Sequence, residues 1–214
     1  MAEAAAAEVT LEGLAARLLE TPPGTRCVLA IAGPPGSGKS TTAARLVEAL
    51  EAARPGAAAL VPMDGFHYDD AVLHELDRHA RKGAPDTFDV GGLRSVLERL
   101  RARDEDWVAV PVFDRDTEMS RAAARLVRRT ADLIVVEGNY LLLNRDPWAS
   151  LRRLFDLRVL IEVPEAVLRA RLEARWRGYR LAPAAIRAKV EGNDLPNGRI
   201  VATESLGADL VLRG

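Results

Sequence analysis

The chain has few of the features that mark secreted or membrane proteins. Cys27 is the only cysteine among the 214 residues, which excludes an internal disulfide and is typical of a reducing compartment. No apolar run reaches the ~18–20 residues that a transmembrane helix needs. The first twenty residues contain Glu3, Glu8 and Glu12 but no basic segment, so they do not have the pattern of a signal peptide. We therefore expect a cytoplasmic protein that does not act at a membrane.

The chain also has no excess of basic over acidic residues, or of acidic over basic residues. The 30 basic and 31 acidic residues are mixed along the chain and give a net charge of −1. Because no segment is a basic block, the sequence does not predict a nucleic-acid partner. Lysine is scarce, since nearly all basic residues are arginine and only Lys39, Lys82 and Lys189 are lysines. A length of 214 residues suits one α/β domain with a substantial core.

One motif organises the rest of the chain. Residues 33–40 (GPPGSGKS) fit G-x-x-x-x-G-K-[ST], the pattern of the phosphate-binding P-loop. The apolar run 28–32 before it predicts a buried strand, and the Ala- and Leu-rich segment 42–53 after it predicts a helix. This strand–loop–helix context is the one that the motif requires. We therefore expect a nucleoside triphosphate to bind here.

The residue types of this loop explain how it would hold a polyphosphate. Glycines allow the backbone to approach the phosphates, and the loop N–H groups and the helix N-terminus supply partial positive charge. Lys39 is expected to reach the β- and γ-phosphates, and the Ser40 hydroxyl is expected to ligate Mg²⁺. The expected nucleotide-binding residues are Gly33, Pro35, Gly36, Ser37, Gly38, Lys39, Ser40 and Thr41.

Two carboxylates follow apolar runs. Asp64 comes after the run 58–63, where open α/β sheets bind ligands, but Asp-Gly is also a common turn dipeptide, so the residues alone leave its role open. The run 132–138 gives the strongest strand signal after the first and ends with Glu137-Gly138. A buried acid without a function is costly, so Glu137 is expected to act near the metal, as a Walker-B-type acid does.

Two arginines stand out on the helix predicted from Glu165 to about Arg177. Arg171 and Arg175 are four residues apart, and no acid lies three or four residues from either of them. Their like charges repel mildly, and a triphosphate would relieve that repulsion. The alternatives are two solvated arginines, or partners from elsewhere in the fold.

The remaining segments give weaker signals. Residues 1–7 are Ala-rich and expected to fray, and Thr10 is expected to cap a short helix. Residues 107–113 predict an edge or hairpin strand because of Pro111, and Ser120 is expected to cap an arginine-bearing helix to about residue 129.

Two polar segments complete the predictions. Residues 69–84 predict a polar helix, and the turn residues at 193–197 predict a loop unless the segment binds a ligand.

In their order and spacing, these motifs resemble the superfamily of uridine kinases, pantothenate kinases and phosphoribulokinases. The nearest branch is that of the bacterial proteins that resemble fructose-transport-system kinases and nucleoside kinases. The blocks that carry the resemblance are residues 33–40, 63–67, 82–89, 110–113 and 136–138, extended by Arg171, Arg175 and residues 193–197.

The resemblance implies a fold and an activity. The fold is α/β: a three-layer αβα P-loop NTPase with a mainly parallel sheet and a small helical lid at about residues 165–192. The expected organisation is a single kinase domain over residues 1–214, in which residues 1–22 form an N-terminal helical extension. The activity is transfer of the γ-phosphate of ATP, with Mg²⁺, to a hydroxyl of a small molecule. Homodimers are common among similar kinases.

The resemblance also implies roles for individual residues. Asp64 would be the base that deprotonates the acceptor hydroxyl, Lys39 would act on the phosphates, and Arg171 and Arg175 would be lid arginines. Glu137 would lie near Mg²⁺ or the substrate. The other residues that would line the acceptor pocket are His67, Phe113, Asn193 and Asn197.

The acceptor itself stays open between a sugar, a nucleoside and a pantothenate-like alcohol. Gly83 stands where uridine kinases have a ribose-binding acid, and this stretch looks more like the pantothenate kinase version. The chain, however, is much shorter than bacterial pantothenate kinases.

The alternative function is a regulatory P-loop NTPase that acts through a partner protein. No Asn-Lys-x-Asp guanine signature occurs in the chain, which argues against a GTPase. A switch protein would place a loop beside the γ-phosphate, whereas a kinase needs room there for an acceptor.

Overall fold

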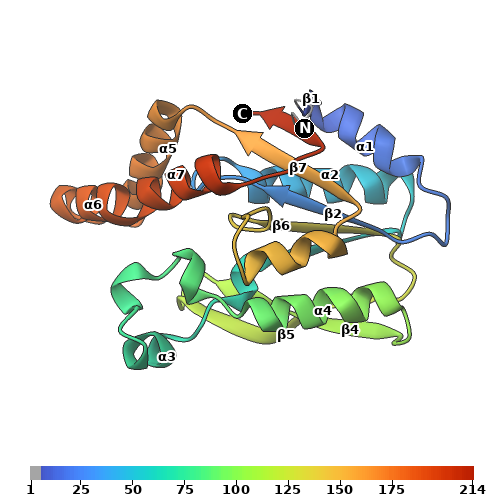
Figure 1. Cartoon of the computed structure of the whole chain (residues 1–214), viewed down its shortest axis with the longest axis horizontal. Coiled ribbons are helices and arrows are strands. Elements are labelled where there is room, and N and C mark those ends of the chain that lie inside the picture. Colours follow the sequence, from blue (N-terminus) through green and yellow to red (C-terminus); the bar gives the residue numbers. More distant parts are fainter. Residues whose placement is uncertain (1–5) are drawn as a thin grey trace.

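The computed structural model describes residues 6–214, and its centre is a six-stranded parallel sheet (Figure 1). The strand order is β1-β8-β7-β2-β6-β3, and every neighbouring pair is parallel. The strands are β1 (Ala7–Glu8), β2 (Cys27–Ala32), β3 (Ala58–Pro62), β6 (Leu133–Gly138), β7 (Leu157–Glu162) and β8 (Leu210–Arg213). The apolar runs 28–32, 58–63 and 132–138 of the sequence therefore form strands, as predicted.

Helices cover both faces of this sheet. In β2, Val28, Ala30 and Ala32 face one core, which α4 (Val90–Ala102) and α7 (Leu195–Glu204) help to close. The alternate residues, Leu29 and Ile31, face the other core, closed by α1 (Leu11–Leu19) and α2 (Lys39–Ala53). The continuous apolar runs are thus buried on both sides, which is typical of a parallel sheet. The predicted three-layer αβα architecture is confirmed (Figure 1).

The N-terminal segment is partly as predicted. Thr10 caps α1, since its Oγ1 accepts a hydrogen bond from the Gly13 N–H at 3.1 Å. Of the residues expected to fray, 1–5 lie outside the described residues. Ala7 was predicted wrongly, because it pairs with Leu210 in the parallel sheet.

A two-stranded antiparallel hairpin, β4 (Trp107–Asp114) with β5 (Met119–Arg128), stands apart from the main sheet. The predicted hairpin strand is confirmed, and its register shifts where Pro111 interrupts the ladder. The predicted helix from Ser120 to Arg129 is wrong. That segment buries only Val127, so it has no apolar stripe that would seat a helix on the core, and pairing with β4 satisfies its backbone instead.

Helices gather at the end of the sheet where the P-loop lies (Figure 1). The polar helix predicted for residues 69–84 is shorter, because α3 covers only Asp70–Glu75 and Asp77 adopts a left-handed φ of +55°. The helix predicted from Glu165 is confirmed as α5 (Glu165–Gly178) and is followed by α6 (Pro183–Lys189). Of the two alternatives for residues 193–197, the simple loop is not observed, since residues 190–194 form one turn of π-helix that runs into α7.

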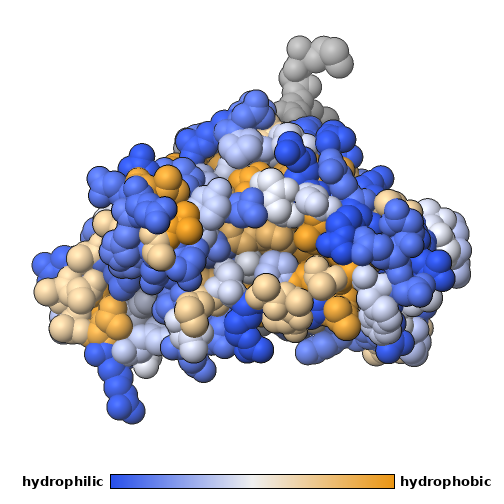
Figure 2. Space-filling model, turned by 90° about the horizontal axis from the view of Figure 1, so that it is seen from below, coloured by the Kyte–Doolittle hydropathy of each residue, from blue (hydrophilic) through white to orange (hydrophobic). Residues whose placement is uncertain are grey.

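The surface is mixed in character. Seen from the side of α4, β4 and β5, hydrophilic side chains surround several separate apolar patches (Figure 2). Among the described residues, no helix is both long enough and apolar enough to cross a bilayer.

Candidate active site

The P-loop has the backbone that its glycines allow. Gly36 and Gly38 have φ values of +80° and +89°, which side-chain-bearing residues rarely adopt. A Cβ on Gly33 would lie 2.8 Å from Ser37 Oγ, too close for van der Waals contact. The helix α2 begins at Lys39, directly after Gly38. The N–H groups of its first turn therefore lie beside the loop.

Two polar groups of this loop suit a polyphosphate. Ser37 is 4% exposed, and its Oγ has no hydrogen-bond partner within residues 6–214. Lys39 is 9% exposed, and the Asp64 and Glu137 carboxylates are near enough for its charge to lower the pKa of the first and oppose the raised pKa of the second. A buried hydroxyl without a partner is costly, and so is a buried ammonium that no hydrogen bond satisfies. An anionic ligand held by the loop would satisfy both, so the residues present fit a nucleotide triphosphate.

Ser40 and Glu137 meet across the loop, because β2 and β6 are neighbours in the sheet. Ser40 Oγ donates a hydrogen bond to Glu137 Oε2 at 3.1 Å. Burial raises the pKa of Glu137, although the positive charge of Lys39 opposes the shift. A hydroxyl and a carboxylate side by side are oxygen ligands of the kind that Mg²⁺ prefers. Ser40 and Glu137 therefore fit Mg²⁺, the ion that the sequence predicts beside them.

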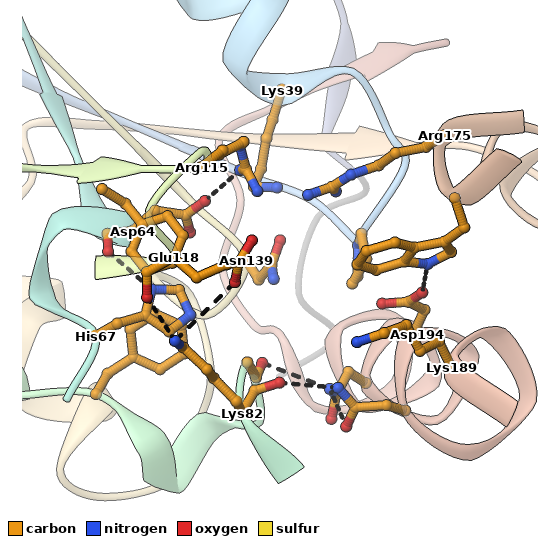
Figure 3. A pocket seen from close by; sticks show the side chains of 17 residues that line it. Lys39, Asp64, His67, Lys82, Arg115, Glu118, Asn139, Arg175, Lys189 and Asp194 are labelled. Atoms are coloured by element: carbon orange, nitrogen blue, oxygen red, sulfur yellow. Dashed lines mark hydrogen bonds and ion pairs between the residues drawn. The ribbon is translucent and has the colours of Figure 1, made fainter. Parts of the chain in front are cut away.

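A cavity beside the P-loop brings together many of the predicted site residues (Figure 3). Its volume is about 830 Å³ including the opening to solvent. The predicted residues that line it are Pro35, Lys39, Asp64, His67, Phe113, Arg175, Asn193 and Asn197. The predicted residues that do not line it are Gly33, Gly36, Ser37, Gly38, Ser40, Thr41, Glu137 and Arg171. Glu137 is nevertheless near Asp64, whose negative charge helps to raise the pKa of Glu137.

Asp64 lies in a 3₁₀ turn, Met63–Phe66, at the carboxyl end of β3. Two glycines allow this turn to pack closely. A Cβ on Gly65 would come within 2.4 Å of the Pro111 carbonyl oxygen, and a Cβ on Gly138 within 2.3 Å of Met63 Cβ. The hairpin and β6 thus hold the turn from two sides. The Asp-Gly dipeptide forms a turn and also presents its carboxylate to the cavity.

Positive charge surrounds the Asp64 carboxylate. Arg115 Nη2, from the turn of the β4–β5 hairpin, donates to Asp64 Oδ2 at 2.8 Å. Burial acts to raise the pKa of Asp64, but it is outweighed by the protonated form of His67 and by the charges of Lys39 and Arg115, so the pKa lies below its ordinary value. The group is therefore ionised at neutral pH, as a base that receives a proton must be.

His67 is fixed beside Asp64 by its ring nitrogen. Its Nδ1 lies 2.7 Å from the Asp64 carbonyl oxygen, which can only accept, so Nδ1 is the protonated nitrogen. The ring packs between Phe88 and Phe113, with centroids at 4.0 and 4.8 Å. Burial lowers the pKa of His67, which keeps the ring neutral.

The two arginines of α5 occupy different places. Arg175 lines the cavity opposite Asp64 (Figure 3), with its guanidinium 5.2 Å from the Trp176 ring centroid. Arg171 instead donates from Nη1 to the Ser37 carbonyl oxygen at 3.4 Å, on the loop itself. One arginine therefore faces the space beside Asp64, and the other contacts the P-loop backbone.

Several cavity residues were missed by the sequence reasoning. They are Arg115, Glu118, Asn139, Trp176 and Lys189. Asn139 had a usable signal, because it stands just after Glu137-Gly138 at the carboxyl end of a buried strand. Arg115 had none, since its segment was assigned to a turn leading to a helix.

Comparison with known proteins identifies the family. The sequence model of the "Phosphoribulokinase / Uridine kinase family" matches residues 28–180. The chain belongs to this family. It is a kinase, and the kinase is 35% identical over 192 residues to "Uncharacterized protein YggC" of Escherichia coli, covering 89% of this chain and 78% of that protein.

Two further relatives cover most of the kinase. "Putative uridine kinase C227.14" of Schizosaccharomyces pombe is 32% identical over 198 residues, covering 88% of this chain and 83% of that protein. The crystal structure of a "putative fructose transport system kinase" from Silicibacter sp. TM1040 superposes with a TM-score of 0.86 at 38% identity. That match covers 95% of this chain and 98% of the other.

The Arg115–Asp64 contact predicts a shift in pH dependence. In Arg115→Gln, one of the charges that lower the pKa of Asp64 is lost, so that pKa rises. The acid limb of the kcat/KM profile, which reports the free enzyme, should move to higher pH. Arg121→Gln is the matched control, because Arg121 pairs with Asp114 on the same hairpin at 3.1 Å. If the acid limb of kcat/KM did not move in Arg115→Gln, Asp64 would not be the group whose ionisation sets that limb.

Proposed function

We propose that this kinase transfers the γ-phosphate of ATP to a hydroxyl group of a small molecule, with Asp64 as the base. The acceptor proton goes to the Asp64 carboxylate, and the acceptor oxygen forms the bond to the γ-phosphorus. The bond from that phosphorus to the β–γ bridging oxygen breaks, and ADP leaves. Such a transfer depends on positioning and charge neutralisation more than on covalent chemistry.

One observation carries the proposal: the cavity in which Lys39, Asp64 and Arg175 converge beside the P-loop (Figure 3). A regulatory NTPase would have a loop at this place. Space for an acceptor, facing an ionised carboxylate, supports a kinase acting on a small alcohol.

Ser40 and Glu137 would hold Mg²⁺, which supplies positive charge to the phosphate oxygens when it is bound. The protein's own part is to fix the two oxygens together, at 3.1 Å, and to keep Glu137 at 3% exposure. Lys39 and Arg175 both line the cavity and add positive charge to it. Residues 165–192, which contain α5 and α6, would act as the lid that brings Arg175 to the phosphates.

Ser40→Ala should weaken the response to Mg²⁺. The variant loses one oxygen of the pair, so the Mg²⁺ concentration for half-maximal activity should rise about tenfold or more. The measurement is a Mg²⁺ titration of activity at saturating acceptor. Ser95→Ala, at an exposed serine of α4, should leave the titration unchanged. An unchanged midpoint in Ser40→Ala would remove Ser40 from the ion's ligands.

A phosphotransfer screen tests the function directly. ATP and Mg²⁺ are supplied with sugars, nucleosides and pantothenate-like alcohols, and both ADP and the phosphorylated acceptor are measured. Acceptor-dependent ADP release with a phosphorylated product is the expected result. ATP hydrolysis that no alcohol stimulates would contradict the proposal.

A further inference from the structure

All three lysines of the chain line the cavity that contains Asp64. They are Lys39, Lys82 and Lys189, and the other basic residues among the 30 of the chain are arginines. A lysine ammonium is a compact charge with three donors, whereas an arginine guanidinium is a planar fork. In a chain that uses arginine almost everywhere else, a lysine indicates a place that needs the compact group. Lys39 belongs to the P-loop, and Lys82 belongs to a different network, which includes the turn of the β4–β5 hairpin.

The Lys82 ammonium joins α3 to this turn. Lys82 Nζ donates to Asp70 Oδ1, at the start of α3, and to the Glu118 carbonyl oxygen, in the turn, both at 2.7 Å (Figure 3 shows Lys82 and Glu118). The Lys82 side chain is only 16% exposed. Its hydrogen bond is the main reason that the pKa of Asp70 is lowered. Hydrogen bonds from an ammonium are among the strong ones, so Lys82 holds the two segments together.

The turn has a backbone that needs such a contact. The β4–β5 ladder ends at Asp114, and Glu118 on the far side of the turn has a φ of +54°, which residues other than glycine rarely adopt. Within the hairpin, Asp114 Oδ1 accepts hydrogen bonds from the N–H groups of Asp116 and Thr117 at 3.1 and 3.2 Å. Lys82 adds a contact from outside the hairpin, at the carbonyl group of Glu118 itself. The position of the turn therefore depends on Lys82 as well as on the turn's own hydrogen bonds.

The same turn carries Arg115, whose Nη2 donates to Asp64 Oδ2 at 2.8 Å. The Arg115 side chain is 42% exposed, and an exposed arginine loses much rotamer freedom when it is held in one place. Whether its guanidinium stays on Asp64 therefore depends on where the turn lies. The Phe113 ring links the two cations, since its centroid lies 5.3 Å from Lys82 Nζ and 5.9 Å from Arg115 Cζ.

We propose that Lys82 is a positioning residue of the phosphotransfer: it holds the β4–β5 turn against α3, so that the Arg115 guanidinium stays on the Asp64 carboxylate. This inference rests on the proposed function, in which Asp64 is the base, and adds to it a residue that acts through Arg115. A lysine that bound the acceptor directly would give different results in the tests below.

Other charged groups also face Asp64 and set the background of any test by pH. They are His67 in its own turn, Lys39 of α2, Arg175 of α5 and Glu137 of β6. Lys82 itself also helps to lower the pKa of His67. A change at Lys82 is therefore compared in two backgrounds, with Arg115 present and with Arg115 replaced, because only the first contains the contact in question.

The first test is a double-mutant cycle read by pH. With ATP and the alcohol that the phosphotransfer screen finds, Lys82→Met should move the acid limb of kcat/KM to higher pH by roughly half a unit or more, as Arg115→Gln does. In the Arg115→Gln background, Lys82→Met should move the limb little further. A loss of folded protein would lower the rate without moving the limb. An unmoved limb in Lys82→Met alone, or equal shifts in both backgrounds, would overturn the positioning role.

The second test needs neither ATP nor an acceptor. In ¹⁵N-labelled protein, the amide order parameters of Asp116 and Thr117 should be roughly 0.85 in the wild type and below about 0.6 in Lys82→Met. Unchanged order parameters would overturn the proposal even if the kinase activity were confirmed. If the order parameters fell but no alcohol were phosphorylated, the proposed function would fail while the contact between Lys82 and the turn stood.

A second variant keeps both tests decisive if Lys82→Met does not fold. Asp70 does not line the cavity, so Asp70→Ala changes the support of Lys82 without changing a group that an acceptor could touch. It should lower the same order parameters and move the acid limb in the same direction. Asp106→Ala is the matched control, because it removes an exposed ion pair with Arg129 at the other end of the hairpin. If Asp70→Ala behaved as Asp106→Ala does, α3 would not hold the turn through Lys82 and the proposal would fail.

Discussion

Replacing Asp64 by Asn is expected to lower kcat by about 10²–10⁴-fold, the usual contribution of a positioned general base. Asn keeps the size of the side chain but cannot take the acceptor proton. ATP should bind at least as well as before, because the substitution removes a negative charge that faces the P-loop lysine and would repel the triphosphate. Single-turnover kinetics and a nucleotide titration measure the two effects separately.

The matched control is Asp104→Asn, at an exposed aspartate outside the cavity. It makes the same chemical change and should leave kcat and nucleotide affinity within experimental error of the wild type. An Asp64→Asn variant that retains a tenth or more of the wild-type kcat would show that Asp64 is not the base. If Asp64→Asn lost ATP binding together with kcat, the ion pair between Asp64 and Arg115 would have a structural role.

The parts of this site that lie on the parallel sheet could be predicted from sequence. Each buried strand is a continuous apolar run, and the carboxyl ends of parallel strands meet at one edge of a sheet. Asp64 follows such a run and Glu137 lies at the end of another, so both could be expected at this edge of the sheet, whereas the role of Asp64 came only from the family resemblance. The glycine-rich loop adds its own pattern, and the strand and helix predicted on either side of it are both confirmed.

The parts that come from the β4–β5 hairpin could not be predicted in this way. Residues 119–128 contain alanine, arginine and little buried surface, so local composition favours a helix and only pairing with β4 decides the strand. Arg115 therefore reaches Asp64, 51 residues away in sequence, through a contact that no periodicity reveals. The 193–197 segment shows the converse, since its turn-forming residues are held in helical geometry by bonds such as that from Asn193 Nδ2 to the Lys82 carbonyl oxygen.

Replacing Lys39 by Met should lower kcat/KM for ATP by about 10²–10³-fold, as the loss of one preorganised charge at a reacting phosphate does elsewhere. Met retains the length and apolar stem of lysine at a site that is 9% exposed, so the fold should tolerate it. A circular dichroism melt and an ATP titration check both statements. Arg45→Met, on the exposed side of the same helix α2, is the matched control and should change neither.

The Lys39 variant should also change the pH dependence, and this separates its two electrostatic effects. Lys39 lowers the pKa of Asp64 and opposes the burial that raises the pKa of Glu137, so its removal raises both pKa values. The acid limb of kcat/KM should therefore move to higher pH, in the same direction as in Arg115→Gln. Arg115→Gln should move the limb with a smaller loss of ATP affinity, because Arg115 pairs with Asp64 whereas Lys39 also belongs to the phosphate loop. Lys39→Met could instead lower the affinity for ATP without moving the acid limb of kcat/KM. Lys39 would then contact the phosphates but not influence the pKa of Asp64. In that case Asp64 would lie farther from the γ-phosphate than the proposed transfer allows.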